Sequence, residues 1–280
     1  MLMDPLSILI LGAVQGIAEW LPISSKTLDT AVFLQMLGGS REAVVPLLLY
    51  LHLGTFLAAL VYFRSQLIEL IRAGWQIVRS AGKNKERGSE LLFFVFALFG
   101  TGLIALPLLW LSKNFLANLD LGFLFAFMGA GLIITALLLH SQKGRRQYRT
   151  TSAAGPLDGL TVGLMQGLSV LPGLSRSGVS TTALIWRGFD AYSAFELSFI
   201  LSIPTVLCAE MVLWGYQLFA DRSLLGALAV GDGLMLAASS AVFGYLTIGA
   251  LLRLARKLDF SVIAGAFGLL MLIAGLVRLT

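Results

Sequence analysis

The sequence LLFFVFALFGTGLIALPLLWL, residues 91 to 111, contains no charged side chain and is long enough to cross a lipid bilayer as a helix. A helix satisfies its own backbone hydrogen bonds in the hydrocarbon core, which an open strand could not do. Comparable apolar runs lie at residues 44 to 63, 121 to 140, 193 to 218, 232 to 250 and 262 to 279. We therefore predict an all-α, polytopic membrane protein with about six transmembrane helices.

The composition excludes an ordinary soluble protein. Of the 280 residues, 58% are hydrophobic and 12% are charged, and the mean hydropathy is +0.88. A typical soluble domain carries about 25% charged residues. The spans leave no room for a separate soluble domain, so we expect one membrane domain over residues 1 to 280. The single cysteine, Cys208, lies in an apolar stretch and excludes a disulfide framework.

The formal net charge of +5 is concentrated in three predicted loops. These basic loops lie at residues 64 to 90, 141 to 155 and 252 to 260. They hold 13 of the 20 Lys and Arg residues, whereas the two remaining loops hold only Lys113 and Arg222. The positive-inside rule places the basic loops in the cytoplasm and the other two outside. Because topology accounts for the excess charge, no nucleic-acid partner is expected.

Two stretches remain, residues 1 to 43 and 156 to 192, and the predicted topology makes each of them begin and end on one side of the membrane. Each combines short apolar segments with a polar turn. This pattern suits a re-entrant helical hairpin, whose irregular backbone is tolerated where protein or a water-filled cavity surrounds it. The two hairpins are expected to enter from opposite sides and to face each other.

The halves of the sequence resemble each other weakly. A shift of 151 residues aligns residues 15 to 18 with 166 to 169, and Ser24 with Ser175. Each half would hold one hairpin and three spans, and the odd number of spans inverts the second half. The predicted repeats are residues 1 to 140 and 156 to 280. Because inverted repeats with broken helices are common in transporters, a transporter is an alternative to an enzyme.

The turn of the second hairpin has the composition of a phosphate site. Arg176 can bind phosphate through its planar guanidinium. The neighbouring glycines would let the backbone approach an anion, and the following helix would point its amides at it. The candidate substrate-binding residues here are Gly173, Ser175, Arg176, Ser177 and Ser180. The alternative is that the serines only cap the helices.

The turn of the first hairpin contains a candidate acid and a candidate nucleophile. Gln15 and Glu19 are four residues apart and would share one helical face. Glu19 could bind a divalent cation or act as a general base, and Ser25 could attack phosphorus or bind phosphate. The alternative is that Glu19 pairs with Arg176 or Lys26 only to neutralise buried charge.

Both turns together resemble a known family. Gln-x-x-x-Glu at residues 15 to 19, Leu-Pro-x-Ser-Ser at 21 to 25 and Pro-Gly-x-Ser-Arg-Ser-Gly at 172 to 178 are similar to the signature segments of undecaprenyl-diphosphatase, the bacitracin-resistance type of lipid pyrophosphatase. The order of hairpins and spans resembles that family over the whole chain. The resemblance implies hydrolysis of a polyprenyl diphosphate to the monophosphate carrier used to export wall and surface glycans.

The resemblance also implies roles for individual residues. Glu19 would be the metal ligand or base, Ser25 the nucleophile unless water attacks, and Arg176 the phosphate binder. A divalent cation, Mg²⁺ or Ca²⁺, would be required. Further substrate-binding residues would be Gln15, Ser24 and Lys26 in the first turn and Gly173, Ser175, Ser177 and Ser180 in the second.

The chain departs from the family pattern at two positions. The usual Thr-Gly-His after the serine pair is replaced by residues 26 to 28, Lys-Thr-Leu, and the first motif position is Gln15 where Glu is commoner. His52, in the middle of a span, is a candidate substitute proton carrier, although it could make only an interhelical hydrogen bond. Glu196 resembles a family glutamate that would pair with Arg176 or Arg187.

The expected partners are the lipid bilayer and a polyprenyl diphosphate, and a homodimer is allowed. The expected location is the plasma membrane, with several spans and an active site facing outward. The sequence does not distinguish a bacterial undecaprenyl carrier from an archaeal one. The alternative function is a non-hydrolytic transporter or flippase for a polyprenyl phosphate.

Overall fold

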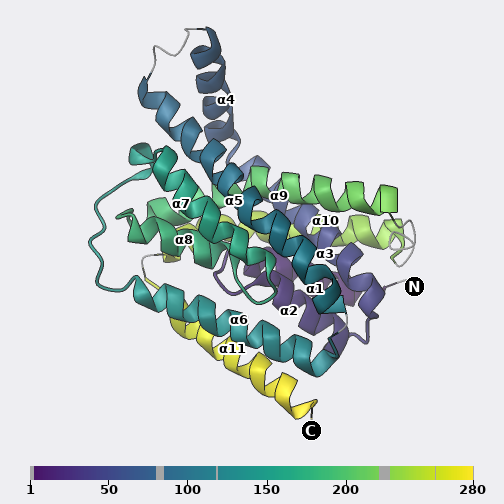
Figure 1. Cartoon of the computed structure of the whole chain (residues 1–280). Coiled ribbons are helices and arrows are strands. Elements are labelled where there is room, and N and C mark those ends of the chain that lie inside the picture. Colours follow the sequence, from purple (N-terminus) through teal and green to yellow (C-terminus); the bar gives the residue numbers. More distant parts are fainter. Residues whose placement is uncertain (1–2, 80–84, 118, 221–227, 256, 280) are drawn as a thin grey trace. The chain divides into compact units, whose positions relative to one another are not determined.

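The computed structural model describes residues 3–79, 85–117, 119–220, 228–255 and 257–279 (Figure 1). All regular elements among these residues are helical, and the β-type pairing within them is one isolated bridge between Arg149 and Phe189. The predicted all-α class is therefore confirmed.

The helices follow the order expected from the hydropathy pattern. They are α1 (Pro5–Ala18), α2 (Ser25–Ala31), η1 (Val32–Met36), α3 (Arg41–Tyr62), α4 (Arg64–Arg79), α5 (Lys85–Ala117), α6 (Leu121–Ser141), η2 (Thr151–Ala153), α7 (Pro156–Gly167), η3 (Leu168–Val170), α8 (Arg176–Trp186), α9 (Ala191–Ala220), α10 (Val230–Leu254) and α11 (Phe260–Val277).

Six helices in the described part of the chain are long and apolar enough to cross a membrane. They are α3, α6, α10 and α11 together with Gly88–Ser112 of α5 and Ala191–Leu213 of α9. Each overlaps one predicted span, which confirms the multi-pass prediction. The sidedness stays a prediction. Residues 80–84, 221–227 and 256, which hold some of the loop charges including Arg222, lie outside the described residues.

The two remaining stretches fold as pairs of short helices. The first pair is α1 and α2, and the second is α7 and α8. Asp4 caps α1 by accepting a hydrogen bond from Ser7 N at 3.0 Å, and Pro5 supplies the first helical residue. None of the four helices reaches the roughly 20 residues that a full span needs. The helical hairpin expected of each stretch is confirmed, and its re-entrant course in the membrane stays a prediction.

The helices group into two compact units. One contains Met1–Leu21, Ser25–Tyr62 and Ser202–Leu251, and the other contains Pro22–Ser24, Phe63–Leu201 and Leu252–Thr280. Each unit contains segments from both halves of the sequence. The inverted repeat stays a prediction.

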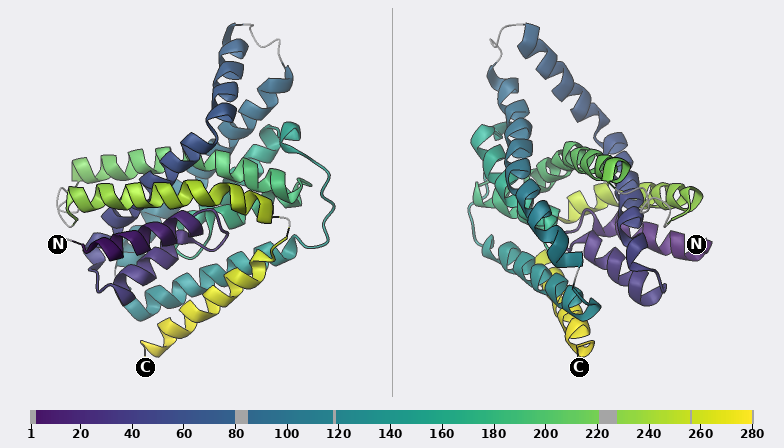
Figure 2. Two further views of the ribbon diagram at one scale, coloured as in Figure 1. Left: turned by 180° about the vertical axis from the view of Figure 1, so that it is seen from behind. Right: turned by 45° about the vertical axis from the view of Figure 1, so that its right-hand side comes forward.

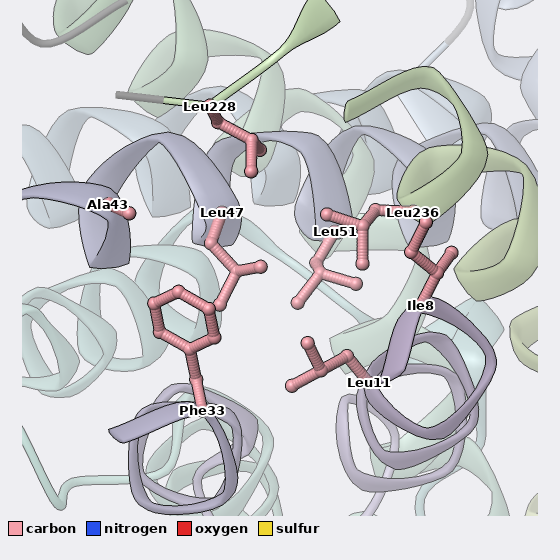
Figure 3. Close-up of a cluster of buried hydrophobic side chains, with 8 residues drawn as sticks. All are labelled: Ile8, Leu11, Phe33, Ala43, Leu47, Leu51, Leu228 and Leu236. Atoms are coloured by element: carbon pink, nitrogen blue, oxygen red, sulfur yellow. The ribbon is translucent and has the colours of Figure 1, made fainter. Parts of the chain in front are cut away.

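The first unit is built around α1, α3 and α10. Its apolar core comprises Ile8, Leu11, Phe33, Ala43, Leu47, Leu51, Leu228 and Leu236 (Figure 3). Small residues bring the helix backbones close together. This is common in membranes, where the hydrophobic effect does not drive helices to associate and close packing does. A Cβ on Gly16 would lie 2.6 Å from Gly244 N, and one on Gly54 would lie 2.1 Å from Ala237 O. This packing fixes the end of α1, where Gln15 and Glu19 lie.

The second unit contains two closely packed helix pairs. Helix α6 runs beside α11, seen in teal and yellow in Figures 1 and 2, and α5 packs against α7. A Cβ on Gly159 would lie 2.1 Å from Phe93 O, and one on Gly163 would lie 2.2 Å from Ala97 O. The glycines of α7 are therefore required by its contact with α5.

An ion-pair network around the buried carboxylate of Asp158 connects the two ends of the second hairpin. Asp158, in the first turn of α7, accepts hydrogen bonds from Arg149 Nη1 at 2.9 Å and Nη2 at 2.6 Å. It also accepts one from Arg187 Nε, just after α8, at 2.7 Å, and one from Gly155 N at 3.1 Å. Asp158 was not among the residues predicted from the sequence. The network joins the start of α7 to the end of α8.

Replacing Asp158 by Ala should destabilise the protein. The change leaves two arginines without their carboxylate, and hydrogen bonds to charged groups contribute about 1.5–3 kcal/mol each. Because both arginines remain partly solvated, we expect a total loss of about 1–3 kcal/mol in the free energy of unfolding. Unfolding of the purified variant in detergent measures this loss.

Lys143→Ala is the matched control for that variant, because it breaks an exposed ion pair and leaves the cap that Asp259 forms on α11 in place. Asp259 pairs with Lys143 at 2.6 Å, but both side chains are nearly half exposed. The hydrogen bond from Lys143 lowers the pKa of Asp259 to about 2. The stabilisation is therefore complete above the ordinary pKa of 3.8 and is lost as the pH falls toward 2. At pH 7 the control should lose less than about 1 kcal/mol. Equal losses for the two variants would contradict the structural role of Asp158.

Candidate active site

A buried polar cluster lies at the end of α1. Glu19 caps α1 and continues its helical course, with its N–H donating to Gln15 O at 2.9 Å. Gln15 Nε2 donates to Glu19 Oε2 at 3.2 Å, which confirms the predicted shared face. Ser25 Oγ, at the start of α2, donates to the same oxygen at 2.5 Å. All three side chains are buried. The predicted acid and nucleophile are thus in direct contact.

Helix α3 completes this cluster. His52 Nε2 lies 3.5 Å from Glu19 Oε2. His52 Nδ1 lies 2.7 Å from Leu48 O, which can only accept, so Nδ1 carries a hydrogen and Nε2 is the nitrogen that faces the carboxylate. Thr55, one turn further along α3, accepts from Gln15 Nε2 at 3.3 Å. We call Gln15, Glu19, Ser25, His52 and Thr55 the Glu19 cluster.

The turn before α2 is held in an unusual conformation. Ser24 has a φ of 56°, the one positive value for a residue other than glycine in the described part of the chain. Such a conformation is uncommon and costly for serine, and strained conformations of this kind cluster at functional sites. Trp20 is buried beside this turn and donates from Nε1 to Gly244 O at 3.1 Å. Ser24 is itself buried, and Lys26 is half-buried.

A second carboxyl group belongs to the same region. Asp29 lies four residues after Ser25 in α2 and is fully buried. It is close enough to Glu19 for the two charges to interact. Asp29 was not among the site residues predicted from the sequence. Its four-residue spacing from Ser25 was the available signal, because that spacing puts both side chains on one face of a helix.

The turn of the second hairpin contains the predicted phosphate binders. Ser175 caps α8, with its Oγ accepting from Gly178 N at 3.3 Å and lying 3.1 Å from Ser177 Oγ. Its own N–H donates to Thr135 Oγ1 on α6 at 3.2 Å. Ser175 therefore has the capping role that was considered as an alternative. Arg176 is the first residue of α8, and its side chain is half-buried.

The glycines of this turn are explained by packing against α6. Gly173 has a φ of +92°, and a Cβ there would lie 2.2 Å from Met128 O. A Cβ on Gly178 would lie 2.6 Å from Thr135 Cγ2. Both positions require glycine whether or not an anion binds. The anion-binding role expected for Gly173 stays a prediction.

Two other predicted residues, Ser180 and Glu196, lie among polar neighbours. Ser180 Oγ lies 2.6 Å from Ser198 Oγ and ties α8 to α9. Glu196, on α9, has acidic neighbours in Glu90 and Asp190. Arg187, one of its two expected partners, binds Asp158 instead.

The structure thus brings Gln15, Glu19, Ser25 and His52 together in one unit. Arg176 and the serines around it belong to the other unit. That the two turns act on one ligand stays a prediction. The Glu19 cluster alone has the elements of covalent catalysis, because a hydroxyl is activated when it donates its hydrogen to an adjacent base.

These features define a class: multi-pass helical membrane proteins with a buried serine–carboxylate pair at a helix turn. The chain belongs to the family described as bacitracin resistance protein BacA, whose model matches residues 8–277. This confirms the resemblance seen in the two signature segments.

Curated relatives match over nearly the whole chain. The undecaprenyl-diphosphatase of Methanococcoides burtonii is 35% identical over 265 residues, covering 94% of this chain and 95% of the relative. That of Haloarcula marismortui is 33% identical over 278 residues, with 98% of both chains covered. That of Pyrobaculum aerophilum is 34% identical over 271 residues, covering 96% of this chain and 97% of the relative.

Proposed function

We propose that this protein hydrolyses undecaprenyl diphosphate, or a related polyprenyl diphosphate, to the lipid monophosphate and inorganic phosphate. The observation that carries the proposal is the buried hydrogen bond from Ser25 to Glu19. It lies in a chain whose relatives are named undecaprenyl-diphosphatase. The reaction regenerates the monophosphate carrier used in the synthesis of envelope glycans.

Ser25 and Glu19 would act as nucleophile and base. As Ser25 Oγ forms a bond to the terminal phosphorus, Glu19 takes the hydroxyl hydrogen. The bond between phosphorus and the bridging oxygen breaks, and the lipid monophosphate leaves. Glu19 passes that proton to the departing lipid monophosphate and then, as a carboxylate again, deprotonates a water molecule that attacks the phosphoserine. The bond between phosphorus and Ser25 Oγ breaks, Ser25 recovers its hydrogen from Glu19, and inorganic phosphate is released. His52 Nε2, 3.5 Å from Glu19 Oε2, can stabilise the ionised carboxylate and exchange a proton with it.

Arg176 would bind the diphosphate and offset the charge that develops on the transferred phosphoryl group. Its support is chemical: it is a permanently charged, bidentate donor at the start of α8, in a turn that also carries Ser175 and Ser177. Gln15, Ser24 and Lys26 would orient the phosphates from the first turn.

A divalent cation, Mg²⁺ or Ca²⁺, would supply positive charge beside the phosphates. The buried carboxylate of Glu19 suits a hard cation that prefers oxygen ligands. Among the described residues no group of three His, Cys, Asp or Glu side chains could hold a metal ion. A cation would therefore be held by few protein groups and by the substrate phosphates, as is usual for Mg²⁺.

We place the protein in the plasma membrane, with the active site on the external side. The support is the charge distribution of the loops, which puts both ends of the first hairpin outside. Labelling of single cysteines introduced into the loops of a Cys208→Ser protein would test this sidedness.

The test of the function is product analysis with purified protein. Undecaprenyl diphosphate should give one lipid monophosphate and one inorganic phosphate per molecule, and a chelator should stop the reaction. Movement of lipid monophosphate across proteoliposomes, with no phosphate released from the diphosphate, would instead support a transporter. Comparing polyprenyl chains of bacterial and archaeal length would identify the carrier.

Ser25→Ala should lower kcat by about a thousandfold or more, because loss of a nucleophile removes the covalent route. The side chain is small, so the fold should remain intact. Single-turnover phosphate release in detergent measures the effect. If activity falls less than about tenfold, water is the attacking group and Glu19 activates it directly.

A further inference from the structure

Asp29 presents two oxygen atoms that no described residue satisfies. The side chain is fully buried in α2, and neither Oδ1 nor Oδ2 has a hydrogen-bond partner in the described part of the chain. A buried carboxylate without a partner is strongly disfavoured. A neutral carboxylic acid does not remove the difficulty, because its O–H would still need an acceptor. A bound cation would give both oxygens a partner.

The side chains near Asp29 also favour a bound cation. Glu19 is near enough for its charge to act on Asp29, so two acidic side chains share one buried region. His52, which carries a charge only when it is protonated, contacts Glu19. A second buried oxygen, Gln15 Oε1, also lacks a partner among the described residues, while Nε2 of the same amide donates to Glu19. Carboxylate and amide oxygens are the ligands that Mg²⁺ and Ca²⁺ prefer.

We infer that Asp29 is a ligand of the divalent cation, which it binds together with Glu19, with Gln15 Oε1 as a third oxygen donor. The inference rests on the proposed function for the identity of the remaining ligands, which would be the phosphates of the substrate. Asp29 would be the second carboxylate of the site, on α2 and four residues after the nucleophile Ser25. Gln15 is neutral, so Glu19 supplies one negative charge to the site. Asp29 supplies a second, and the two carboxylates together balance the charge of a divalent cation.

The helical position of Asp29 fits this role. Ser25 and Asp29 lie on one face of α2, and Ser25 Oγ donates to Glu19 Oε2 at 2.5 Å. The face of α2 that carries Asp29 is therefore turned toward Glu19. A cation held by Glu19 and Asp29 would supply positive charge that stabilises the phosphoryl group attacked by Ser25.

Mn²⁺ binding tests the inference without relying on activity. Purified protein is titrated with Mn²⁺ alone and free Mn²⁺ is followed by electron paramagnetic resonance, with Mg²⁺ as competitor. The wild type should bind one Mn²⁺ that Mg²⁺ displaces, and Asp29→Asn should bind it at least tenfold more weakly. Glu42→Gln, which removes an exposed carboxylate from α3 of the same unit, should bind as the wild type does.

Thermal unfolding separates a ligand from a structural residue. Without metal, Asp29→Asn should unfold at the same temperature as the wild type or a higher one, because the amide has the size of the carboxyl group and cannot carry a charge in this buried position. Mn²⁺ should raise the unfolding temperature of the wild type and not that of the variant. A variant that unfolds earlier without metal and is stabilised by Mn²⁺ as the wild type is would overturn the inference.

The outcomes distinguish this inference from the proposed function. If Asp29→Asn binds Mn²⁺ like the wild type while the wild type hydrolyses undecaprenyl diphosphate, the ligand assignment is wrong and the function stands. If Mn²⁺ binding depends on Asp29 while no phosphate is released from the lipid, the cation site stands and the function is wrong.

Discussion

Glu19→Gln should lower kcat/KM for undecaprenyl diphosphate by about a hundredfold to ten-thousandfold, the range expected when a general base is lost. The amide keeps the size of the side chain but cannot take the hydrogen that Ser25 now donates to Glu19 Oε2 at 2.5 Å. It also removes one negative charge from a buried region that contains Asp29. The variant should therefore fold at least as stably as the wild type while losing activity.

The matched control is Glu42→Gln, the same chemical change at an exposed position of α3. Its kcat/KM should equal that of the wild type. Initial rates of phosphate release, measured for the three proteins in the same detergent, give the comparison. Wild-type rates from Glu19→Gln would rule out the catalytic role of Glu19.

Arg176→Ala should lower kcat by about a hundredfold to a thousandfold, as expected when a donor to the developing phosphoryl charge is removed. Lysine keeps the charge but cannot form the planar, two-point contact of a guanidinium. Arg176→Lys should therefore recover only part of the activity. KM should rise in both variants, because the ground-state diphosphate loses the same contact.

Arg145→Ala controls for the loss of a cation from the second unit. Arg145 is exposed, and its guanidinium lies 5.8 Å from the ring centre of Trp186. We expect this variant to keep its kcat. If Arg176→Ala retains more than a tenth of the wild-type kcat, Arg176 does not bind the reacting phosphate.

The helical class and the six spans could be predicted because the bilayer fixes both the length and the polarity of a crossing helix. The contact between Gln15 and Glu19 was equally accessible, since a four-residue spacing on one helix places side chains together. Ser25 followed Glu19 closely enough in sequence for a tight turn to bring them together. These are local properties of the chain.

The rest of the cluster depends on packing between helices. His52 and Thr55 reach Glu19 and Gln15 from α3 because small residues hold α1, α3 and α10 together. The direction of Asp29 depends on the turn at Ser24, whose positive φ no pattern in the sequence indicates. Such long-range contacts leave no periodic signal.

The second turn contains the expected glycines, but the structure gives them a different explanation. Glycines beside Ser-Arg-Ser fit an anion cradle, but they also fit a turn that packs against another helix. Gly173 and Gly178 do the latter, against Met128 and Thr135 of α6. Asp158 was overlooked for a related reason: its partners Arg149 and Arg187 lie in separate segments that only the folded hairpin joins.

Photolabelling tests most directly whether both turns act on one diphosphate. A polyprenyl diphosphate analogue, with a short photoreactive group beside the phosphates, is bound to the purified protein and activated, and the labelled peptides are identified by mass spectrometry. If both turns bind the diphosphate, peptides from α1–α2 and from α7–α8 should be labelled, and undecaprenyl diphosphate should prevent both labels. Label confined to one of the two turns, or unaffected by undecaprenyl diphosphate, would contradict binding by both turns.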